Sequence, residues 1–333
     1  MRMWRGRDEI PADWGRCVAA IGVFDGIHRG HRRLIDAAVE AARARSVPTV
    51  LVTFDPHPLA VTRPGTAPAR LSTLDQRAAL AAAAGVDALL VVEFTEDFAR
   101  LTPEQFVTGL LVDQLHVGEV IVGENFTFGH RAAGDADTLT RLGERHGFAV
   151  RVVGLLDDGA VTVSSTYIRA RIAEGDVAAA AAALGRPHRV EGTVVRGFQR
   201  GRELGFPTAN LDVPAGTAIP ADGVYAAWLR LLAPAEAPDG TGGPGVLDPD
   251  RIYQAAVSVG TNPTFDGVER TVEAHVLDTA ADMYGAHVAV DFVDRLRGMD
   301  RFDGVDALIA AMDDDVARTR EVLGPPGDAS AGG

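Results

Sequence analysis

The first half of the fold is decided by the stretch Gly22-Val-Phe-Asp-Gly-Ile-His-Arg-Gly-His31. It follows an apolar run, Cys17–Ile21, and precedes a helical pattern, His31–Arg45. A strand, a glycine-rich turn and a helix start are typical of an anion site, because the first N–H groups of the helix and its dipole face the ligand. His28 and His31 are three residues apart, so we expect them to share one face at the helix entrance.

Strand and helix patterns alternate on both sides of this stretch. Short apolar runs predict buried strands, and amphipathic stretches between them predict helices. This alternation predicts a parallel sheet with helices on both faces, which binds ligands beyond the carboxyl ends of its strands. The expected strands are Thr49–Phe54, Ala88–Phe94, Glu119–Val122 and Phe148–Leu155, and the expected helices are Leu71–Ala84, Pro103–Leu115, Ala136–His146, Ser164–Ile172 and Val177–Leu184.

The pattern changes near residue 185, where helices give way to glycine-punctuated strands. A small closed antiparallel barrel with a C-terminal helix is therefore expected. We predict a first domain at residues 1–184, a second at 185–324 and a disordered tail at 325–333, with Ala233–Asp250 as a disordered surface insertion. The expected strands are Arg189–Arg196, Val224–Leu232, Tyr253–Val259, Thr271–Leu277 and His287–Leu296, followed by a helix from Val305 to Val322.

Composition excludes several chemistries. All 32 basic residues are arginine, so a P-loop lysine, a Schiff-base lysine and the lysine-rich second signature of many tRNA synthetases are impossible. The net charge of −14 argues against a nucleic-acid partner. No apolar run approaches the ~20 residues of a membrane span, and no secretory signal is expected. The single Cys17 favours a reducing cytoplasm.

Two further motifs of the first half have both a structural and a functional interpretation. Gly123-Glu-Asn-Phe-Thr-Phe-Gly129, with Gly134-Asp135, follows a strand and is either an aromatic hairpin or part of a ligand site. Ser164-Ser-Thr-Tyr-Ile-Arg169 opens a helix, where Ser and Thr are ordinary N-caps. The same hydroxyls and Arg169 could instead grip a triphosphate without any lysine.

The second half offers an independent candidate site. In Pro207-Thr-Ala-Asn210, a strand would point Thr208 and Asn210 to one side, and their oxygens suit Mg²⁺ that also holds ATP phosphates. An N-cap or Asx turn is the plain alternative. Glu273 lies on the polar face of Thr271–Leu277, which is either solvated or places a general base for a kinase.

The motifs of the first half resemble a known family. Gly22–His31 resembles the His-x-Gly-His element of nucleotidylyltransferases. Together with Thr53-Phe-Asp-Pro-His-Pro58, Gly123–Asp135 and Ser164–Arg169, it resembles the Rossmann-like adenylyltransferase half of prokaryotic bifunctional riboflavin kinase/FAD synthetases. The resemblance implies that His28 and His31 make catalytic contacts with the phosphates. It also implies that Ser164, Ser165 and Arg169 take the role of the second signature motif of tRNA synthetases, which this family has lost. The implied ATP- and FMN-binding residues are Gly22, Phe24, Asp25, Gly26, Gly30, Asn125, Ser164, Ser165 and Arg169.

The second half resembles the riboflavin kinase module of the same family. The matching segments are Gly201–Leu211, Gly223-Val-Tyr225, Gly260–Phe265, Val272-Glu-Ala-His275 and Tyr284-Gly285 with Phe292. The resemblance implies that Thr208 and Asn210 bind Mg-ATP and that Glu273 activates the 5′-hydroxyl of riboflavin. The implied ATP- and flavin-binding residues of this module are Gly201, Arg202, Gly205, Thr208, Asn210 and Arg297.

Our leading hypothesis is therefore a two-step flavin cofactor synthase that uses ATP and Mg²⁺ to make FMN and then FAD. Its partners would be small molecules (riboflavin, FMN and ATP), without nucleic acid or membrane, and self-association into a homo-oligomer is left open. One rival is a nucleotidylyltransferase for another phosphate acceptor with a barrel used only for binding. A second rival is a flavin sensor without catalysis.

Overall fold

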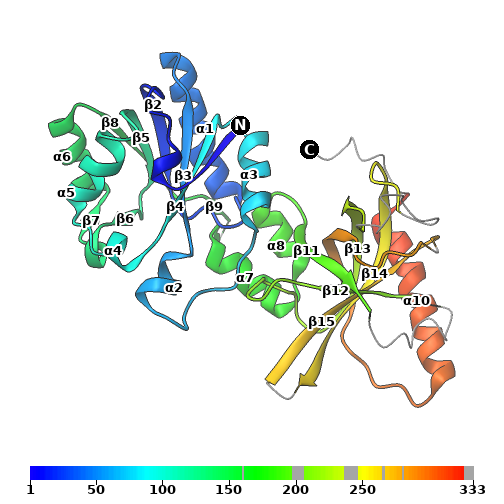
Figure 1. The fold of residues 1–333 in the computed structure, drawn as a ribbon. Coiled ribbons are helices and arrows are strands. Elements are labelled where there is room, and N and C mark those ends of the chain that lie inside the picture. The colour runs from blue at the N-terminus through cyan, green and yellow to red at the C-terminus, as the bar shows by residue number, and fades with distance from the viewer. Residues whose placement is uncertain (160, 197–205, 236–246, 265–266, 280, 326–333) are drawn as a thin grey trace. The chain divides into compact units, whose positions relative to one another are not determined.

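A computed structural model describes residues 1–159, 161–196, 206–235, 247–264, 267–279 and 281–325 (Figure 1). Contacts divide the chain into two compact units, Met1–Ser165 and Thr166–Gly333. Most of the expected insertion and tail lies outside the described residues, as do Gly201, Arg202 and Gly205. No helix in the described ranges is both long enough and apolar enough to cross a membrane.

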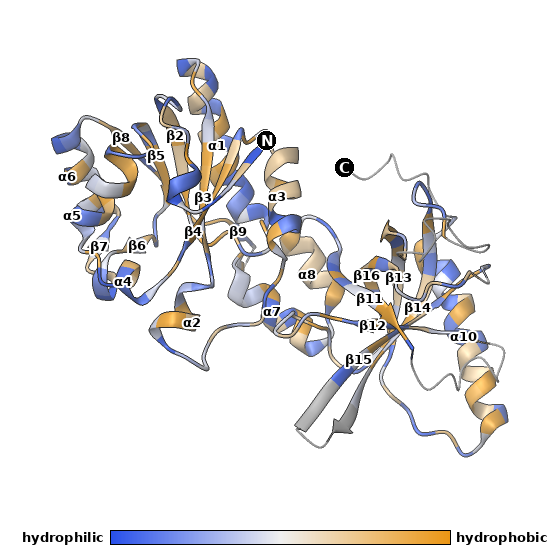
Figure 2. Ribbon diagram, viewed as in Figure 1, coloured by the Kyte–Doolittle hydropathy of each residue, from blue (hydrophilic) through white to orange (hydrophobic). Residues whose placement is uncertain are grey.

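The first unit is built on a parallel sheet with the strand order β1-β4-β3-β2-β5-β8. All residues of β2 are buried, and alternate side chains enter the cores on the two faces. The strands of this sheet are coloured as largely hydrophobic in Figure 2. The strands are β1 (Arg2–Arg5), β2 (Cys17–Ile21), β3 (Thr49–Asp55), β4 (Ala88–Glu93), β5 (Val117–Gly123) and β8 (Ala149–Val153).

Helices cover both faces of this sheet. One face packs against α1 (Arg29–Arg45) and α3 (Leu74–Ala83). The other packs against α5 (Pro103–Phe106), the π-helical segment Val107–Val112 that continues it, and α6 (Ala136–His146). Short elements connect them: the 3₁₀ turns Arg7–Glu9 and His130–Ala132, helices α2 (Pro58–Thr62) and α4 (Glu96–Ala99), and the hairpins β6 (Thr127–Phe128) with β7 (Gly134–Asp135) and β9 (Asp157–Asp158) with β10 (Val161–Thr162).

The expected parallel sheet with helices on both faces is confirmed, with four local differences. The strand expected to be buried over Phe148–Leu155 is β8, an edge strand whose residues are exposed or half-buried. Strand β1 was not expected, because its sequence Arg-Met-Trp-Arg buries only Trp4 at the edge of the sheet. Helix α1 begins at Arg29 rather than His31. The helix expected over Pro103–Leu115 changes to π geometry after Phe106 and ends near Val112.

The second unit contains the expected closed antiparallel barrel, with the strand order β11-β12-β15-β14-β13-β16. Helix α10 (Val305–Leu323) packs on β13, β14 and β16. Its Asp315 carboxylate accepts two hydrogen bonds from Arg297, of 2.8 and 2.7 Å. The strands are β11 (His188–Val195), β12 (Ala209–Asp212), β13 (Gly223–Ala233), β14 (Ile252–Thr264), β15 (Gly267–Val276) and β16 (His287–Arg297).

Two helices precede the barrel, α7 (Ser165–Glu174) and α8 (Val177–Leu184). We expected both to close the first half, but α8 packs on β11 and β16 of the barrel. The contacts thus divide the chain near residue 165 rather than residue 184. The domain boundaries expected from the sequence stay a prediction.

Candidate active sites

The turn after β2 brings the chain sharply into α1. Phe24, Gly26 and Ile27 all have positive φ angles, of 51°, 83° and 34°. The Phe24 ring is fully buried among the side chains that α1 and the sheet share. The packing of this buried ring stabilises the unfavourable positive φ angles of the turn and so fixes the position at which α1 begins.

His28 and His31 lie together at the start of α1. His28 is the N-cap, only 5% exposed, and its Nδ1 accepts a hydrogen bond of 3.3 Å from the His31 backbone N–H. The two rings are stacked, with centroids 3.6 Å apart, and the Phe24 and His31 rings meet in a T-shaped contact. Because Nδ1 of His28 is an acceptor, a neutral His28 ring carries its proton on Nε2, which can donate to a ligand.

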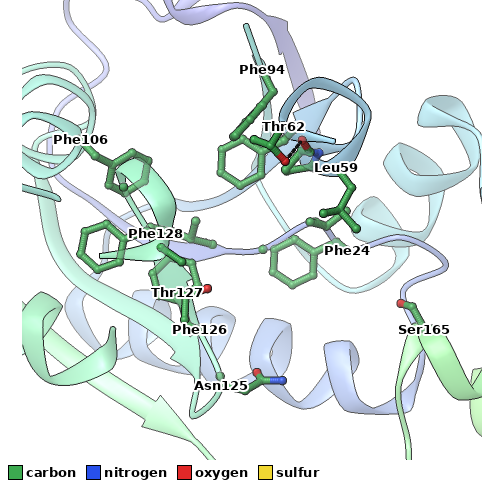
Figure 3. Close-up of a pocket in the computed structure, with 18 of the residues that line it drawn as sticks. Phe24, Leu59, Thr62, Phe94, Phe106, Asn125, Phe126, Thr127, Phe128 and Ser165 are labelled. Atoms are coloured by element: carbon green, nitrogen blue, oxygen red, sulfur yellow. Dashed lines mark hydrogen bonds between the residues drawn. The ribbon is translucent and has the colours of Figure 1, made fainter. Parts of the chain in front are cut away.

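A pocket of about 1020 Å³ opens at the carboxyl ends of the parallel strands (Figure 3). Its lining comes from the segments that follow β2, β3, β4, β5 and β8, as expected for a sheet of this kind. The size suits a ligand larger than a single nucleotide. The sequence-predicted residues that line it are Gly22, Phe24, His28, Gly30, His31, Asn125, Ser164 and Ser165.

Phenylalanine rings form an aromatic wall at one end of this pocket. The rings make a continuous series of contacts, with neighbouring centroids between 5.4 and 6.1 Å apart. In Figure 3 Phe94, Phe106, Phe126 and Phe128 surround this end, and Ser165 lies at the other side of Phe24. We did not predict the wall, although a phenylalanine near the end of each of β3, β4 and β5 was a usable signal. Its members are Phe54, Phe94, Phe98, Phe106, Phe126 and Phe128.

Two predicted ligand residues face the protein interior instead of the pocket. The Asp25 carboxylate is 3% exposed and accepts hydrogen bonds from the backbone N–H groups of Leu71 and Ser72. The Gly26 N–H donates to the Ser72 hydroxyl at 2.9 Å. Neither Asp25 nor Gly26 lines the pocket, although the Asp25 backbone carbonyl accepts a 3.0 Å hydrogen bond from the Ser165 hydroxyl.

Arginines supply the cationic part of the pocket lining. Arg100 is engaged in ion pairs with Glu96 and Asp97. Arg63 and Arg131 are exposed, and within the described part of the chain their guanidinium groups have no hydrogen bond or ion pair. Sequence reasoning missed both, since nothing in the local pattern separates them from other surface arginines.

Asn125 and Arg169, the remaining predicted residues of this module, differ in position. Asn125 is exposed and lies in the turn after β5, where its side chain borders the pocket (Figure 3). Arg169 is half-buried on α7, in the second compact unit, and is not part of the pocket lining.

The candidate site of the second unit lies on the outer wall of the barrel. Asn210 on β12 stands directly opposite Glu273 on β15, and Ser258 on β14 follows in the same row. Their neighbours Ala209, Val272 and Ala274 point into the barrel core, so the polar side chains occupy the other face. The pairing of Asn210 with Glu273 joins two segments that lie far apart in the sequence.

Thr208 completes this polar group. Burial raises the pKa of the Glu273 carboxyl above its usual value, and the nearby Thr208 side chain opposes that shift. Next to them, the His275 Nδ1 and the Pro207 carbonyl oxygen lie 2.9 Å apart, and the Phe206 and His275 rings meet in a T-shaped contact. These contacts hold the segment that carries Thr208.

The oxygen ligands at this site suit Mg²⁺, which usually keeps water and substrate phosphates as ligands. They do not suit a metal that is coordinated by protein side chains alone. Thr208 and Asn210 offer a hydroxyl and an amide carbonyl, which are hard oxygen ligands. Among the described residues, no group of three or more His, Cys, Asp or Glu side chains is arranged to hold a metal ion. A metal here would therefore share its coordination with substrate phosphates and water.

The Arg297 guanidinium makes ion pairs and hydrogen bonds with other side chains of the protein. It bonds both oxygens of Asp315, lies 3.5 Å from Asp300, and covers the ring of Phe302. In this arrangement Arg297 anchors α10 to the barrel. Its part in binding ATP or flavin stays a prediction.

Comparisons with known proteins match the two halves of the chain to two different family models, and each half contains one of the two candidate sites. A family model for FAD synthetase matches residues 10–167, and one for riboflavin kinase matches residues 184–323. The bifunctional riboflavin kinase/FMN adenylyltransferase of Escherichia coli strain K12 is 37% identical over 92% of this chain and 93% of its own. The protein of the same name from Pseudomonas fluorescens is 36% identical over 98% of this chain and 99% of its own.

A solved structure matches the chain over almost its full length. The crystal structure described as a macrolide-efflux protein from Streptococcus pneumoniae has a TM-score of 0.83 at 32% identity, over 96% of this chain and 98% of that chain. Its printed description names macrolide efflux, whereas the names of the two relatives above do not. The likeness supports the fold of both units.

Proposed function

Because the chain belongs to the bifunctional riboflavin kinase/FMN adenylyltransferase family, we propose that its two candidate sites carry the two activities in turn. The second unit phosphorylates riboflavin to FMN, and the first unit transfers AMP from ATP to FMN to give FAD. The observation that carries this proposal is the presence of two separate candidate sites, each inside the residues matched by the corresponding family model.

In the first unit, a phosphate oxygen of FMN attacks the α-phosphorus of ATP. The new P–O bond forms as the bond between the α-phosphorus and its bridging oxygen breaks, and pyrophosphate leaves. Negative charge gathers on the α-phosphate and the leaving group, where preorganised donors act most strongly. His28 Nε2, His31 and the first N–H groups of α1 are the donors for that charge.

The rest of the pocket fits the flavin. The aromatic wall offers a stacking surface for the isoalloxazine ring, which is flat and largely apolar. Arg63 and Arg131 supply positive charge for phosphates in a chain that has no lysine and a net charge of −14. Asn125, Ser164 and Ser165 border the same space and complete the proposed substrate contacts.

In the second unit, Glu273 accepts the proton of the riboflavin 5′-hydroxyl. The hydroxyl oxygen then attacks the γ-phosphorus of ATP, the bond to the bridging oxygen breaks, and ADP leaves. Thr208 and Asn210 would hold Mg²⁺, which when bound offsets the charge of the ATP phosphates. The Thr208 side chain, which lowers the pKa of the Glu273 carboxyl, favours its deprotonated form for this task.

The single Cys17 supports a reducing compartment, for which we propose the cytoplasm. It is buried, its Sγ lies 3.2 Å from the Leu115 carbonyl, and burial raises its pKa to about 12, so the thiol is unreactive.

The direct test mixes the purified full chain with riboflavin and Mg-ATP and follows the products by chromatography. We expect FMN to appear first and FAD later, with ADP and pyrophosphate as the second products. Supplying FMN in place of riboflavin should yield FAD with pyrophosphate and without ADP.

Chelation with EDTA is the control for the metal. It should stop FMN formation, and excess Mg²⁺ should restore it. Turnover of another phosphate acceptor with no use of FMN would contradict the proposal, and so would flavin binding without any ATP consumption.

A change in the aromatic wall tests the flavin site. Phe126→Ala removes a half-buried ring that stacks on Phe128, so the KM for FMN is expected to rise by about tenfold. The KM for ATP and the rate of riboflavin phosphorylation should change little. Steady-state kinetics of both reactions measure this, and Phe126→Tyr, which keeps the ring, is the matched control.

A further inference from the structure

Arg77 is a buried charge that the proposed reaction does not use. It lies on α3, is 5% exposed, and does not line the pocket. Burying a guanidinium is unfavourable unless its charge and donors are matched. Burial lowers the pKa of the Arg77 guanidinium, and the carboxylates of Asp25 and Asp55 oppose that change. The partners of Arg77 are therefore a guide to its purpose.

Those partners lead to the turn before His28 along two routes. On the first, Arg77 Nη1 donates to the Thr53 hydroxyl at 2.9 Å, and that hydroxyl donates to the Val23 carbonyl at 2.7 Å. On the second, Arg77 Nη2 lies 3.8 Å from the Asp25 carboxylate. Val23 and Asp25 flank Phe24, the first residue of the turn with a positive φ.

Ser72 closes the network from the other side. Its hydroxyl donates to the Asp25 carboxylate at 3.2 Å and accepts from the Gly26 N–H at 2.9 Å. The Asp25 carboxylate also accepts from the N–H groups of Leu71 and Ser72. Strand β3, helix α3 and the segment before it are thus all connected to residues 23–26, which carry strained backbone.

We propose that Arg77, Asp25, Thr53 and Ser72 form a buried latch that positions the turn of His28 and His31 for adenylyl transfer. Arg77, Asp25, Thr53 and Ser72 do not line the pocket, so they are positioning residues that act through the turn. The inference rests on the proposed adenylyltransferase function of the first unit. It replaces the expectation that the Asp25 side chain binds substrate.

The latch has a distinct kinetic consequence. Loosening it displaces two imidazoles that stabilise charge in the transition state, while the aromatic wall and arginines that bind the ground state stay in place. A displacement of that kind lowers kcat far more than it raises KM. A network that only stabilised the fold would lower the amount of active protein and leave the kinetics of the folded fraction unchanged.

The first test compares Thr53→Val and Arg77→Ala with the wild-type full chain. Thr53→Val keeps the side-chain shape and removes the hydroxyl link. For FAD formation we expect kcat to fall by about 10-fold in Thr53→Val and by about 100-fold in Arg77→Ala, with KM for ATP and FMN within about threefold. Riboflavin phosphorylation, measured on the same samples, should be unchanged. Arg141→Ala, an exposed arginine on α6, is the matched control.

The second test is chemical rescue. Guanidinium or methylguanidinium chloride at about 20 mM, well below denaturing concentrations, should refill the space left in Arg77→Ala and raise its kcat for FAD by at least about threefold. Matched NaCl and urea should have no such effect. Because guanidinium weakens folded proteins, a variant that was merely less stable would respond in the opposite direction.

The outcomes separate this inference from the proposed function. Failure of the wild-type chain to make FAD from FMN and ATP would overturn the function itself. Wild-type FAD formation with unchanged kcat in Thr53→Val and Arg77→Ala would overturn the latch alone. Unfolding of the first unit in both variants, with no recovery in guanidinium, would also overturn it, since the network would then serve stability only.

Discussion

Replacing both His28 and His31 by alanine is expected to lower FAD formation by about 10³-fold or more, because loss of a single preorganised donor already costs about 10²–10³ in rate. FMN formation from riboflavin should continue at the wild-type rate, since it takes place in the second compact unit. Product analysis with riboflavin and Mg-ATP would then show FMN accumulating without FAD.

The single variants separate catalysis from helix capping. His28 caps α1 through Nδ1, so His28→Ala also removes a cap worth about 1 kcal/mol. His28→Asn keeps a good capping side chain and removes the imidazole. We expect His28→Asn to lose nearly as much FAD-forming activity as His28→Ala while its thermal stability stays close to that of the wild type. An equal loss of both activities in a folded double variant would contradict the two-site assignment.

Glu273→Gln should produce the opposite separation of activities. The amide keeps the shape of the side chain but cannot accept the 5′-hydroxyl proton, and a general base typically contributes 10²–10⁴-fold, so riboflavin phosphorylation should fall by about that much. FAD formation from supplied FMN should be unaffected. A Glu273→Gln protein that phosphorylates riboflavin normally would show that Glu273 is not the base.

The pH profile of the kinase reaction supplies an independent signature. Glu273 acts in its deprotonated form, so the rate falls as pH drops through its pKa. Burial raises that pKa above the ordinary 4.5, and the acidic limb should therefore lie above that value. Thr208→Val removes the hydroxyl that lowers the pKa of Glu273, so its acidic limb should move to higher pH. A profile of kcat/KM against pH for both proteins measures the shift.

The two predicted sites differ in how far apart their residues lie in the sequence. The site of the first unit is assembled around one short stretch, so the sequence alone predicted that its two histidines lie together at one helix entrance. The site of the second unit depends on β12 lying opposite β15. Spacing in the sequence indicated Thr208, Asn210 and Glu273 separately, but it carried no information on the register that sets Asn210 against Glu273.

The sequence by itself determined the alternation of strands and helices in the first half, the parallel sheet, the barrel and a helix entrance close to His28 and His31, because these follow from the period of apolar residues and from glycines at a tight turn. Only the tertiary structure decided which side chains meet. In the tertiary structure Asp25 points inward, bonds Ser72 and lies near Arg77, and Arg297 pairs with Asp315. Phenylalanines that follow several strands pack together in one aromatic wall. Such contacts join residues far apart in the chain, and their partners are set by strand order and packing, which no local pattern encodes.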